Sequence, residues 1–356
     1  MQMRAIAFRT HGGPEVLEDV EFTIPDAPPP GYARVRVTAC ALNHLDLWMR
    51  RGLPHLKLEL PHRLGSDVAG TIEALPSGAE RSNVVSRGPE WSVGAQVILS
   101  PGISCGACEA CLSGRDNFCR QYKMLGENTH GGYGELLDVP MANLLPQPPS
   151  LSIEEGAALP LVSLTAWQMV VDKAKVKRGD VVLVHAAGAG VSTAAIQIAK
   201  SLGARVIATS TSAAKLERAR ALGADEVIDT SKQDFVAEVK RLTGKRGADV
   251  CIEHVGGDTF SKSLVALVNG GRLVTCGATS GFTPPIDLRH VFFRQLEVLG
   301  STMGSKSALF SVLRLVQSGL LRPVVDRVLP FTAEGAREAH RVLEGREAFG
   351  KVVMKR

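Results

Sequence analysis

The stretch from Val181 to Gly203 constrains the fold of this chain more than any other. It reads VVLVHAAGAGVSTAAIQIAKSLG: apolar and β-branched residues, a turn of small residues, and apolar positions at helical spacing. This order predicts a strand, a tight turn and a helix. Small residues let the backbone approach a ligand closely, and the free N–H groups at a helix start favour a phosphate. The pattern predicts a dinucleotide site at Ala187, Gly188, Ala189, Gly190 and Val191, although α/β proteins that bind no nucleotide share it.

Alternating segments strengthen this prediction, because the glycine pattern GxGxxG is itself degraded, with Ala187, Ala189 and Ser192 in place of its three glycines. Six strand-like segments lie at 181–185, 205–209, 226–228, 249–253, 272–276 and 296–301, and helical segments lie at 191–202, 213–222, 235–243 and 259–268. Such alternation predicts a doubly wound parallel sheet of the α/β class, with its ligand at the carboxyl ends of the strands.

The end of the second predicted strand bears on which dinucleotide is bound. NAD sites usually place an acidic residue there for the ribose hydroxyls, but this chain has Ser210. No carboxylate would repel a 2′-phosphate, and Ser210, Thr211, Ser212 and Lys215 offer it donors. We therefore expect NADPH rather than NADH, the alternative being a polar turn that caps the next helix.

Four cysteines form the strongest local motif. Cys105, Cys108, Cys111 and Cys119 give the spacing CxxCxxCx7C within a polar lobe at about 101–122. Four thiolates at such spacing close a tetrahedron around zinc and leave no open position for chemistry. We expect one structural zinc ion per subunit; an iron–sulfur cluster and four unligated cysteines are the alternatives.

Length and composition set the class of protein. A chain of 356 residues with 45% hydrophobic and 22% charged residues suits two globular domains. The net charge of +5 is dispersed, so no nucleic-acid partner is expected. Neither a secretory signal nor an apolar run of about 18 residues is present, so we expect no membrane association and a cytoplasmic location.

The flanking segments predict a second, discontinuous domain. Short alternating strands broken by Gly and Pro fill 4–41, and a Pro-rich segment, QPPS, marks a boundary near Ser150. The tail after Gly304 ends in a strand at 350–353 that returns to the first domain. We therefore expect one domain at 1–151 and 305–356 and a dinucleotide-binding domain at 152–304.

These features together resemble the medium-chain dehydrogenase/reductase superfamily over essentially the whole chain. The cysteine lobe, GGYGE, LTAW, the AAGAGV turn and GGRLVTCGATSG occur in the superfamily's order. The resemblance implies a GroES-like, barrel-type catalytic domain beside a Rossmann domain. It also implies a homodimer or homotetramer joined through LEVLGSTMG. Further cofactor contacts would come from Thr165, Val255, Gly277 and Ala278.

By the same resemblance, the three ligand positions of a catalytic zinc carry Asn43 in NHLD, Ser66 in GSD and Leu161 in LVSLT. A leucine cannot bind zinc, and an asparagine and a serine replace thiolate and imidazole poorly. The resemblance thus implies a reductase branch that keeps structural zinc and lacks catalytic zinc. Simple ketone reduction is hard without a Lewis acid. Reduction of an activated C=C bond is easier, because charge spreads onto a carbonyl oxygen that hydrogen-bond donors can hold.

Four residues are candidates for this chemistry. Asn43 and Ser66 are candidate donors to the substrate oxygen, and His44 and Asp46 are candidate acid or relay groups. Asp46 has the alternative of only holding the NHLD turn, and His44 that of contacting the cofactor pyrophosphate.

The leading hypothesis is an NADPH-dependent reductase of a 2-enoyl thioester. The segments GSTMG and CGATSG resemble those of acryloyl-CoA and 3,3-dimethylacrylyl-CoA reductases, which implies a coenzyme A ester as the substrate. Alternatives are a quinone oxidoreductase, a zinc-dependent alcohol dehydrogenase and a non-catalytic NADPH-binding protein.

Overall fold

A computed structural model describes residues 1–53, 56–76 and 91–356 and divides the chain into two compact units. The first unit comprises 1–161 and 324–356, and the second comprises 162–323. The first unit is discontinuous, but its edges differ from the expected 151 and 305. Helix α3 (Ile153–Ala158) contacts strands of the first unit, and α10 (Lys306–Gln317) falls in the second.

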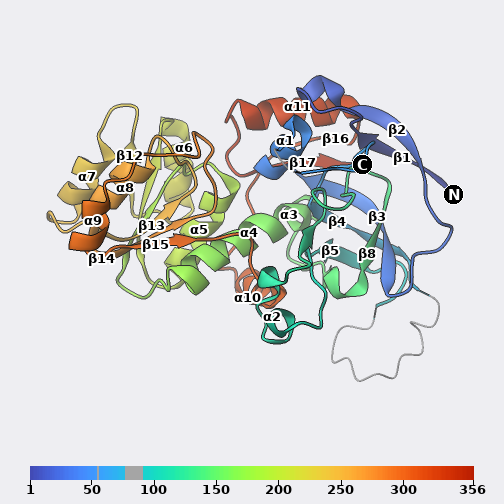
Figure 1. Ribbon diagram of the computed structural model, residues 1–356, viewed down its shortest axis with the longest axis horizontal. Helices are drawn as coiled ribbons and strands as arrows, with labels where there is room; N and C mark the ends of the chain where they lie inside the picture. Colours follow the sequence, from blue (N-terminus) through green and yellow to red (C-terminus); the bar gives the residue numbers. More distant parts are fainter. Residues whose placement is uncertain (54–55, 77–90) are drawn as a thin grey trace. The chain divides into compact units, whose positions relative to one another are not determined.

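The second unit is built on a six-stranded parallel sheet in the order β12-β11-β10-β13-β14-β15 (Figure 1). Its strands are β10 (Val181–Val184), β11 (Arg205–Ser210), β12 (Glu226–Asp229), β13 (Ala248–Glu253), β14 (Leu267–Thr275) and β15 (Glu297–Gly300). The chain order reverses between β10 and β13, which is the switch point where such sheets bind ligands. The predicted doubly wound sheet is confirmed.

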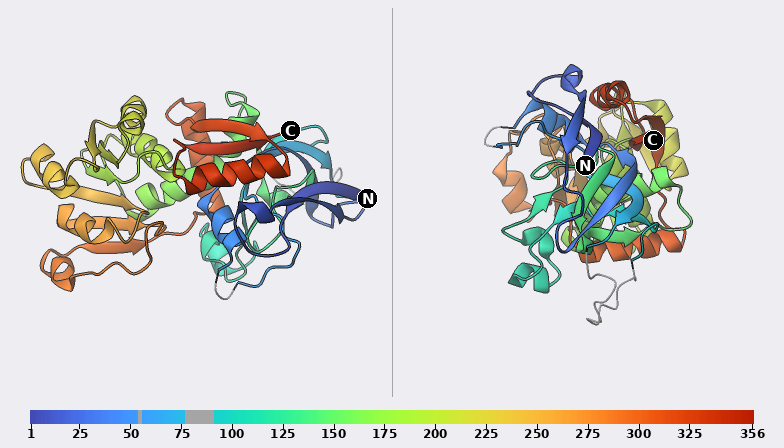
Figure 2. Two further views of the ribbon diagram at one scale, coloured as in Figure 1. Left: turned by 90° about the horizontal axis from the view of Figure 1, so that it is seen from above. Right: turned by 90° about the vertical axis from the view of Figure 1, so that its right-hand side faces the viewer.

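Helices of the second unit connect these strands and flank the sheet on both faces (Figure 2). They are α5 (Gly190–Ser201), α6 (Ala213–Ala221), α7 (Phe235–Leu242), α8 (Phe260–Ala266), α9 (Leu288–Phe293) and α10, preceded by a π-helical segment, Gln168–Lys173. Strand β10 is buried at all four positions, as expected for a strand covered on both faces. The helix expected at 259–268 ends earlier, because Leu267 already pairs with Ala248 in the sheet.

The first unit is built on a seven-stranded sheet with the path β16-β17-β3-β4-β5-β9, in which β8 also pairs with β3. These strands are β3 (Tyr32–Ala41), β4 (Asp67–Ala74), β5 (Gln96–Leu99), β8 (Leu136–Pro140), β9 (Leu144–Pro146), β16 (Val325–Pro330) and β17 (Lys351–Lys355). Smaller antiparallel pairs join β1 (Gln2–Ala7) to β2 (Glu18–Thr23) and β6 (Gly102–Ile103) to β7 (Lys123–Met124). The pairing is antiparallel except between β16 and β17, which run parallel because α11 connects them.

Three helices complete the first unit and close its core. Helix α1 (His44–Arg51) follows β3, α3 contacts β3, β4 and β17, and α11 (Ala333–Glu344) lies against β16 and β17 (Figure 2). The cysteine lobe contains α2 (Glu109–Leu112), and α4 (Pro160–Trp167) begins at the end of the first unit. Among the described helices none is long and apolar enough to cross a bilayer.

Candidate functional site

The turn after β10 has the geometry of an anion-binding helix start. Ala186 adopts a left-handed conformation (φ 48°), and the Ala187 N–H donates to the Thr209 carbonyl at 2.8 Å, which closes the turn against β11. Ala189 then stands at the N-cap of α5 and has no side-chain oxygen to offer. The first N–H groups of α5 thus receive no side-chain cap, and they remain available to a ligand.

Four other helices in the same unit have a side-chain N-cap. Ser212 accepts from the Lys215 N–H in α6, Asp234 from two N–H groups in α7, Asp287 from the Arg289 N–H in α9, and Ser305 from the Ala308 N–H in α10. Helix α5 shares the absence of a side-chain cap with α8, and the small residues of the turn before it distinguish its start. The predicted residues Ala187 to Val191 all lie at this turn or in the first turn of α5.

A buried hydrogen-bond network holds the turn between β10 and α5 in place. Ser192 Oγ donates to the His185 carbonyl at 2.7 Å and contacts His254 Nε2 at 2.8 Å. Glu253 accepts from the N–H groups of Val255 and Gly256 at 2.7 and 3.0 Å. These bonds tie the ends of β10 and β13 together, so the predicted contact residue Val255 lies beside the turn.

His185 and Glu253, with Cys251, also place their ligand atoms within 4.8 Å of one another. Burial lowers the pKa of His185 to about 4, so the ring is neutral at physiological pH. Both of its nitrogens already contact hydroxyl groups, those of Thr209 and Ser263. We therefore interpret this cluster as structural. Sequence reasoning missed it because His185 follows β10, whereas Cys251 and Glu253 lie on β13.

The segment after β11 has the structural role that was the alternative interpretation, a polar turn that caps the next helix, while the binding of a 2′-phosphate stays a prediction. Ser212 caps α6, and the Ser212 N–H donates to Ser210 Oγ at 3.2 Å, so the polar turn does have a structural role. No carboxylate stands among residues 210–215. Thr211 is exposed at the tip of this turn, where its hydroxyl is accessible.

In the first unit, two of the three residues expected at the catalytic-metal position, Asn43 and Leu161, donate to one buried carboxylate. Asp67 accepts from Asn43 Nδ2 at 3.0 Å and from the Leu161 N–H at 2.8 Å. A third donor comes from Lys351, whose Nζ lies 2.9 Å from Asp67 and also donates to the Asn43 amide oxygen. Lys351 is only 3% exposed. A lysine ammonium therefore supplies positive charge among the positions that hold zinc ligands in the resembling enzymes.

Lys351 escaped sequence reasoning because it lies 284 residues from Asp67 in the chain. It opens β17, which pairs with β3, and β3 leads directly into Asn43. The segment around Lys351, GKVVMK, is typical of an ordinary strand. The only available signal was a charged residue at the start of an apolar strand.

The other candidate residues of this site have structural partners. Asp46 is fully buried and accepts from the N–H groups of Asn43 and Gly65 at 2.7 and 2.9 Å. Burial raises the pKa of Asp46 to about 6. Ser66 is fully buried and donates its hydroxyl to the Leu125 carbonyl at 2.7 Å. Asp46 thus holds the NHLD turn, while His44 is half-buried at the start of α1.

The four cysteines of the lobe gather as the motif predicts. Their sulfur atoms all lie within 4.8 Å of one another, with Cys105 and Cys108 at 3.8 and 3.5 Å from Cys111. A tetrahedral zinc site with Zn–S bonds of about 2.3 Å requires sulfur separations of about 3.8 Å. The thiol set therefore fits zinc in both ligand type and spacing.

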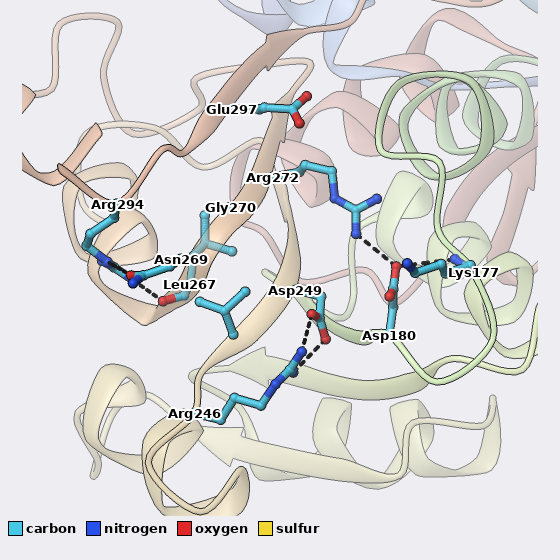
Figure 3. Close-up of a pocket in the computed structure, with 11 residues that line it drawn as sticks. Lys177, Asp180, Arg246, Asp249, Leu267, Asn269, Gly270, Arg272, Arg294 and Glu297 are labelled. Carbon is cyan, nitrogen blue, oxygen red and sulfur yellow. Dashed lines mark hydrogen bonds and ion pairs between the residues drawn. The ribbon is translucent and has the colours of Figure 1, made fainter. Parts of the chain in front are cut away.

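A large concavity of about 760 Å³ lies at the opposite edge of the second unit's sheet (Figure 3). Its charges are largely paired internally: Arg272 binds Asp180 at 2.9 Å and Arg246 binds Asp249 at 2.6 Å. It surrounds the amino ends of the strands, whereas ligands of doubly wound sheets bind at the carboxyl ends. This concavity is therefore not the dinucleotide site.

Comparison with known protein families gives two matches. Residues 29–149 match the alcohol dehydrogenase GroES-like domain, and residues 190–318 match the zinc-binding dehydrogenase domain. The chain belongs to the medium-chain dehydrogenase/reductase superfamily. It is an oxidoreductase of that superfamily, as the sequence resemblance implied.

Individual relatives of this dehydrogenase/reductase carry different activities. A crystal structure of an NAD-dependent alcohol dehydrogenase is 52% identical, with a TM-score of 0.92 and coverage of 99% of this chain and 100% of the other. An NAD-dependent alcohol dehydrogenase of Sulfurisphaera tokodaii is 32% identical over 99% of each chain. A 2-haloacrylate reductase of Burkholderia sp. is 30% identical, again over 99% of each chain. Membership is thus shared by enzymes acting on alcohols and on activated double bonds.

Proposed function

We propose that this protein is an NADPH-dependent reductase of an activated C=C bond, with a 2-enoyl thioester such as an acyl-CoA as its substrate. The observation that carries the proposal is the buried Asn43–Asp67–Lys351 cluster at the expected catalytic-metal position. A lysine ammonium brings charge but has no vacant orbital for an alcohol oxygen, so it cannot act as the Lewis acid of a zinc alcohol dehydrogenase.

The residues around the second unit's turn would hold the cofactor. We assign the pyrophosphate to Gly188, Gly190 and Val191 at the uncapped start of α5. We assign the 2′-phosphate to Ser210, Thr211, Ser212 and Lys215, and further contacts to Thr165, Val255, Gly277 and Ala278. When bound, NADPH supplies the hydride that adds to the β-carbon of the substrate.

Asn43 would hold the substrate's carbonyl oxygen as negative charge develops there. Lys351 donates to the Asn43 amide oxygen, which turns the amide nitrogen toward Asp67 and the site. Asp67 takes one Nδ2 proton, so the second remains for the substrate oxygen. Lys351 is in this sense a positioning residue, because it fixes which end of the amide can donate.

The α-carbon must receive a proton to complete the reduction. Asp46 accepts backbone N–H groups with both carboxylate oxygens, and the Ser66 hydroxyl already donates a hydrogen bond to the Leu125 carbonyl. We therefore assign proton delivery to His44, which directly follows Asn43 and reaches the surface of its unit.

Two further assignments complete the proposal. Cys105, Cys108, Cys111 and Cys119 would hold one structural zinc, which cross-links the lobe without joining the reaction. Strand β15 is the last strand of its sheet and pairs on its outer side with no strand of the described residues. Val298 on it lies in a chain segment with the exposed Leu288, Phe292 and Phe293. Such an edge favours pairing with a second copy, so we propose a homodimer or a dimer of dimers. Seven free thiols suit the reducing cytoplasm.

Initial rates with the purified protein test this function. We expect rapid oxidation of NADPH with a short 2-enoyl-CoA, slower oxidation of NADH, and little turnover of a benzoquinone. A faster rate with the quinone would move the protein to the quinone oxidoreductases. Reduction of NAD by a secondary alcohol as the main activity would refute the proposal and agree with the 52% identical structure instead.

A further inference from the structure

Ser192 joins the two ends of the turn between β10 and α5. It is fully buried in the first turn of α5, and its Oγ donates to the His185 carbonyl at 2.7 Å. His185 directly follows β10, so this one bond spans the whole turn. Ser192 stands where the pattern GxGxxG has its third glycine, a residue that serves close packing of helix and strand. In this chain a side-chain hydrogen bond connects the helix to the strand.

His254 holds the same hydroxyl from the end of the neighbouring strand, β13. Its Nε2 lies 2.8 Å from Ser192 Oγ, and the residue is 8% exposed. Burial lowers the pKa of His254, so the ring is neutral at physiological pH and carries a single N–H proton. The Ser192 hydroxyl has one proton, which the His185 carbonyl accepts. The Ser192 oxygen can therefore only accept from His254, so the ring proton lies on Nε2.

The backbone of His254 is tied to a second segment, residues 277–281. The His254 carbonyl accepts from the Thr279 N–H at 3.3 Å, and the next carbonyl, that of Val255, accepts from the Ser280 N–H at 2.7 Å. This segment includes two of the residues that we assign to the cofactor. His254 is thus hydrogen-bonded to both segments, to the start of α5 through its ring and to residues 277–281 through its carbonyl.

We propose that His254 is a positioning residue for the dinucleotide, which fixes the start of α5 and the 277–281 segment relative to each other. This inference rests on the proposed assignment of the pyrophosphate to the uncapped start of α5. Binding of an anion there needs several N–H groups that point in one direction. The Ser192–His254 hydrogen bond holds the turn in one shape before binding, and such preorganisation raises affinity because binding need not order the turn.

Calorimetric titration of the purified, dinucleotide-free protein with NADPH tests this role without a substrate. We expect H254F to raise the Kd about tenfold, because the phenyl ring fills similar space but has no proton for Ser192 Oγ. H254Q offers an amide N–H near the position of Nε2 and should restore the wild-type Kd to within about threefold. H290F, on α9 of the same unit, is the matched control and should bind as the wild type does.

S192A provides a second measurement if H254F does not fold. The alanine removes the oxygen that the ring holds, so the Kd should again rise about tenfold. The S192A/H254F double variant should bind no more weakly than either single variant, because both substitutions remove the same hydrogen bond. Additive losses in the double variant would overturn the claim that the two residues act through each other.

Two further outcomes would overturn the proposal. One is a folded H254F protein that binds NADPH as tightly as the wild type. The other is equal weakening in H254F and H254Q, since a packing role of the ring would then explain the loss.

Titration with NADH separates this proposal from the choice of cofactor, because both dinucleotides carry the pyrophosphate. A wild type that binds neither dinucleotide would refute the proposed function together with the role of His254. A wild type that binds one of them, with an unchanged Kd in H254F, would refute the role of His254 alone.

Discussion

The cysteine lobe and the Asn43–Asp67–Lys351 cluster occupy the two places where the superfamily resemblance anticipates metal. They differ in the source of the positive charge that balances their ligands. In the lobe, four sulfur atoms face one another, and the ligand set fits a cation from solution. In the cluster, the cation is part of the chain: Lys351 already binds Asp67 and Asn43. A site that carries its own cation has no electrostatic need for a metal.

The difference also explains how strongly each region depends on one side chain. Two carboxylates are buried in this region, Asp67 of the cluster and Asp46 beside it, and Lys351 is the cation that binds Asp67 directly. Removing one partner from a buried ion pair leaves an uncompensated charge in a medium of low dielectric constant. The lobe lies on a polar surface, where Cys105 is exposed, and it can lose its ligand with less effect on the core.

Substitution of Lys351 by methionine should have the largest effect. We expect K351M to lower the free energy of unfolding by about 3–5 kcal/mol, because Asp67 loses its buried counter-ion. Urea denaturation measures this change. K355M is the matched control on the same strand. Lys355 pairs with Glu154 while 41% exposed, so about 1 kcal/mol or less is expected. Similar losses in both variants would show that the buried cation has no special role.

The pH dependence of stability sharpens the comparison within the cluster. Burial raises the pKa of Asp46 from 3.8 to about 6, so folding favours the protonated carboxyl. Its contribution is complete below about pH 3.8 and is lost as the pH rises through about 6. Relative to D46N, the wild type should therefore lose about 3 kcal/mol over this window. Urea unfolding at several pH values measures the difference.

Asp19 is exposed and provides the control. The difference between the wild type and D19N should stay nearly constant over the same pH window. An equally constant difference for D46N would mean that Asp46 is not protonated preferentially on folding.

Substitution of Asn43 tests the catalytic half of the comparison. We expect N43A to lower kcat with the enoyl thioester about 100-fold, the loss typical of one donor to a developing oxyanion. Cofactor affinity should not change, since the residues that we assign to the dinucleotide lie in the other unit. N269A, at an exposed site, should behave as wild type. Unchanged kcat in N43A would remove this residue from the mechanism.

The sequence predicted the parts of this molecule that depend on near neighbours. The parallel sheet follows from alternating apolar segments, and the cysteine cluster from spacings within 15 residues. The final strand, expected at 350–353 from a local pattern, is found at 351–355. The family resemblance placed residues 43, 66 and 161 at one site. The structure joins two of them, Asn43 and Leu161, through Asp67, whereas Ser66 donates to the Leu125 carbonyl instead.

The features that the sequence did not reveal depend on distant partners. Lys351 and Asn43 lie 308 residues apart, and no local pattern links them. His254 likewise holds the hydroxyl of a residue 62 positions away in the chain. Ser66 was expected to donate to substrate. Its hydroxyl instead donates to the backbone carbonyl of Leu125, which lies 59 residues away in the chain and faces it. Hydrogen-bond direction at a buried site is set by such tertiary neighbours.

The zinc content of the wild type and of C108S tests the central claim most directly. Mass spectrometric metal analysis should find about one zinc per wild-type subunit and almost none in C108S, because the lobe is then the single zinc site. C276S, outside the lobe, should keep the wild-type content. Two zinc ions in the wild type, or one retained in C108S, would contradict the account and place a metal at the cluster that we assign to Lys351.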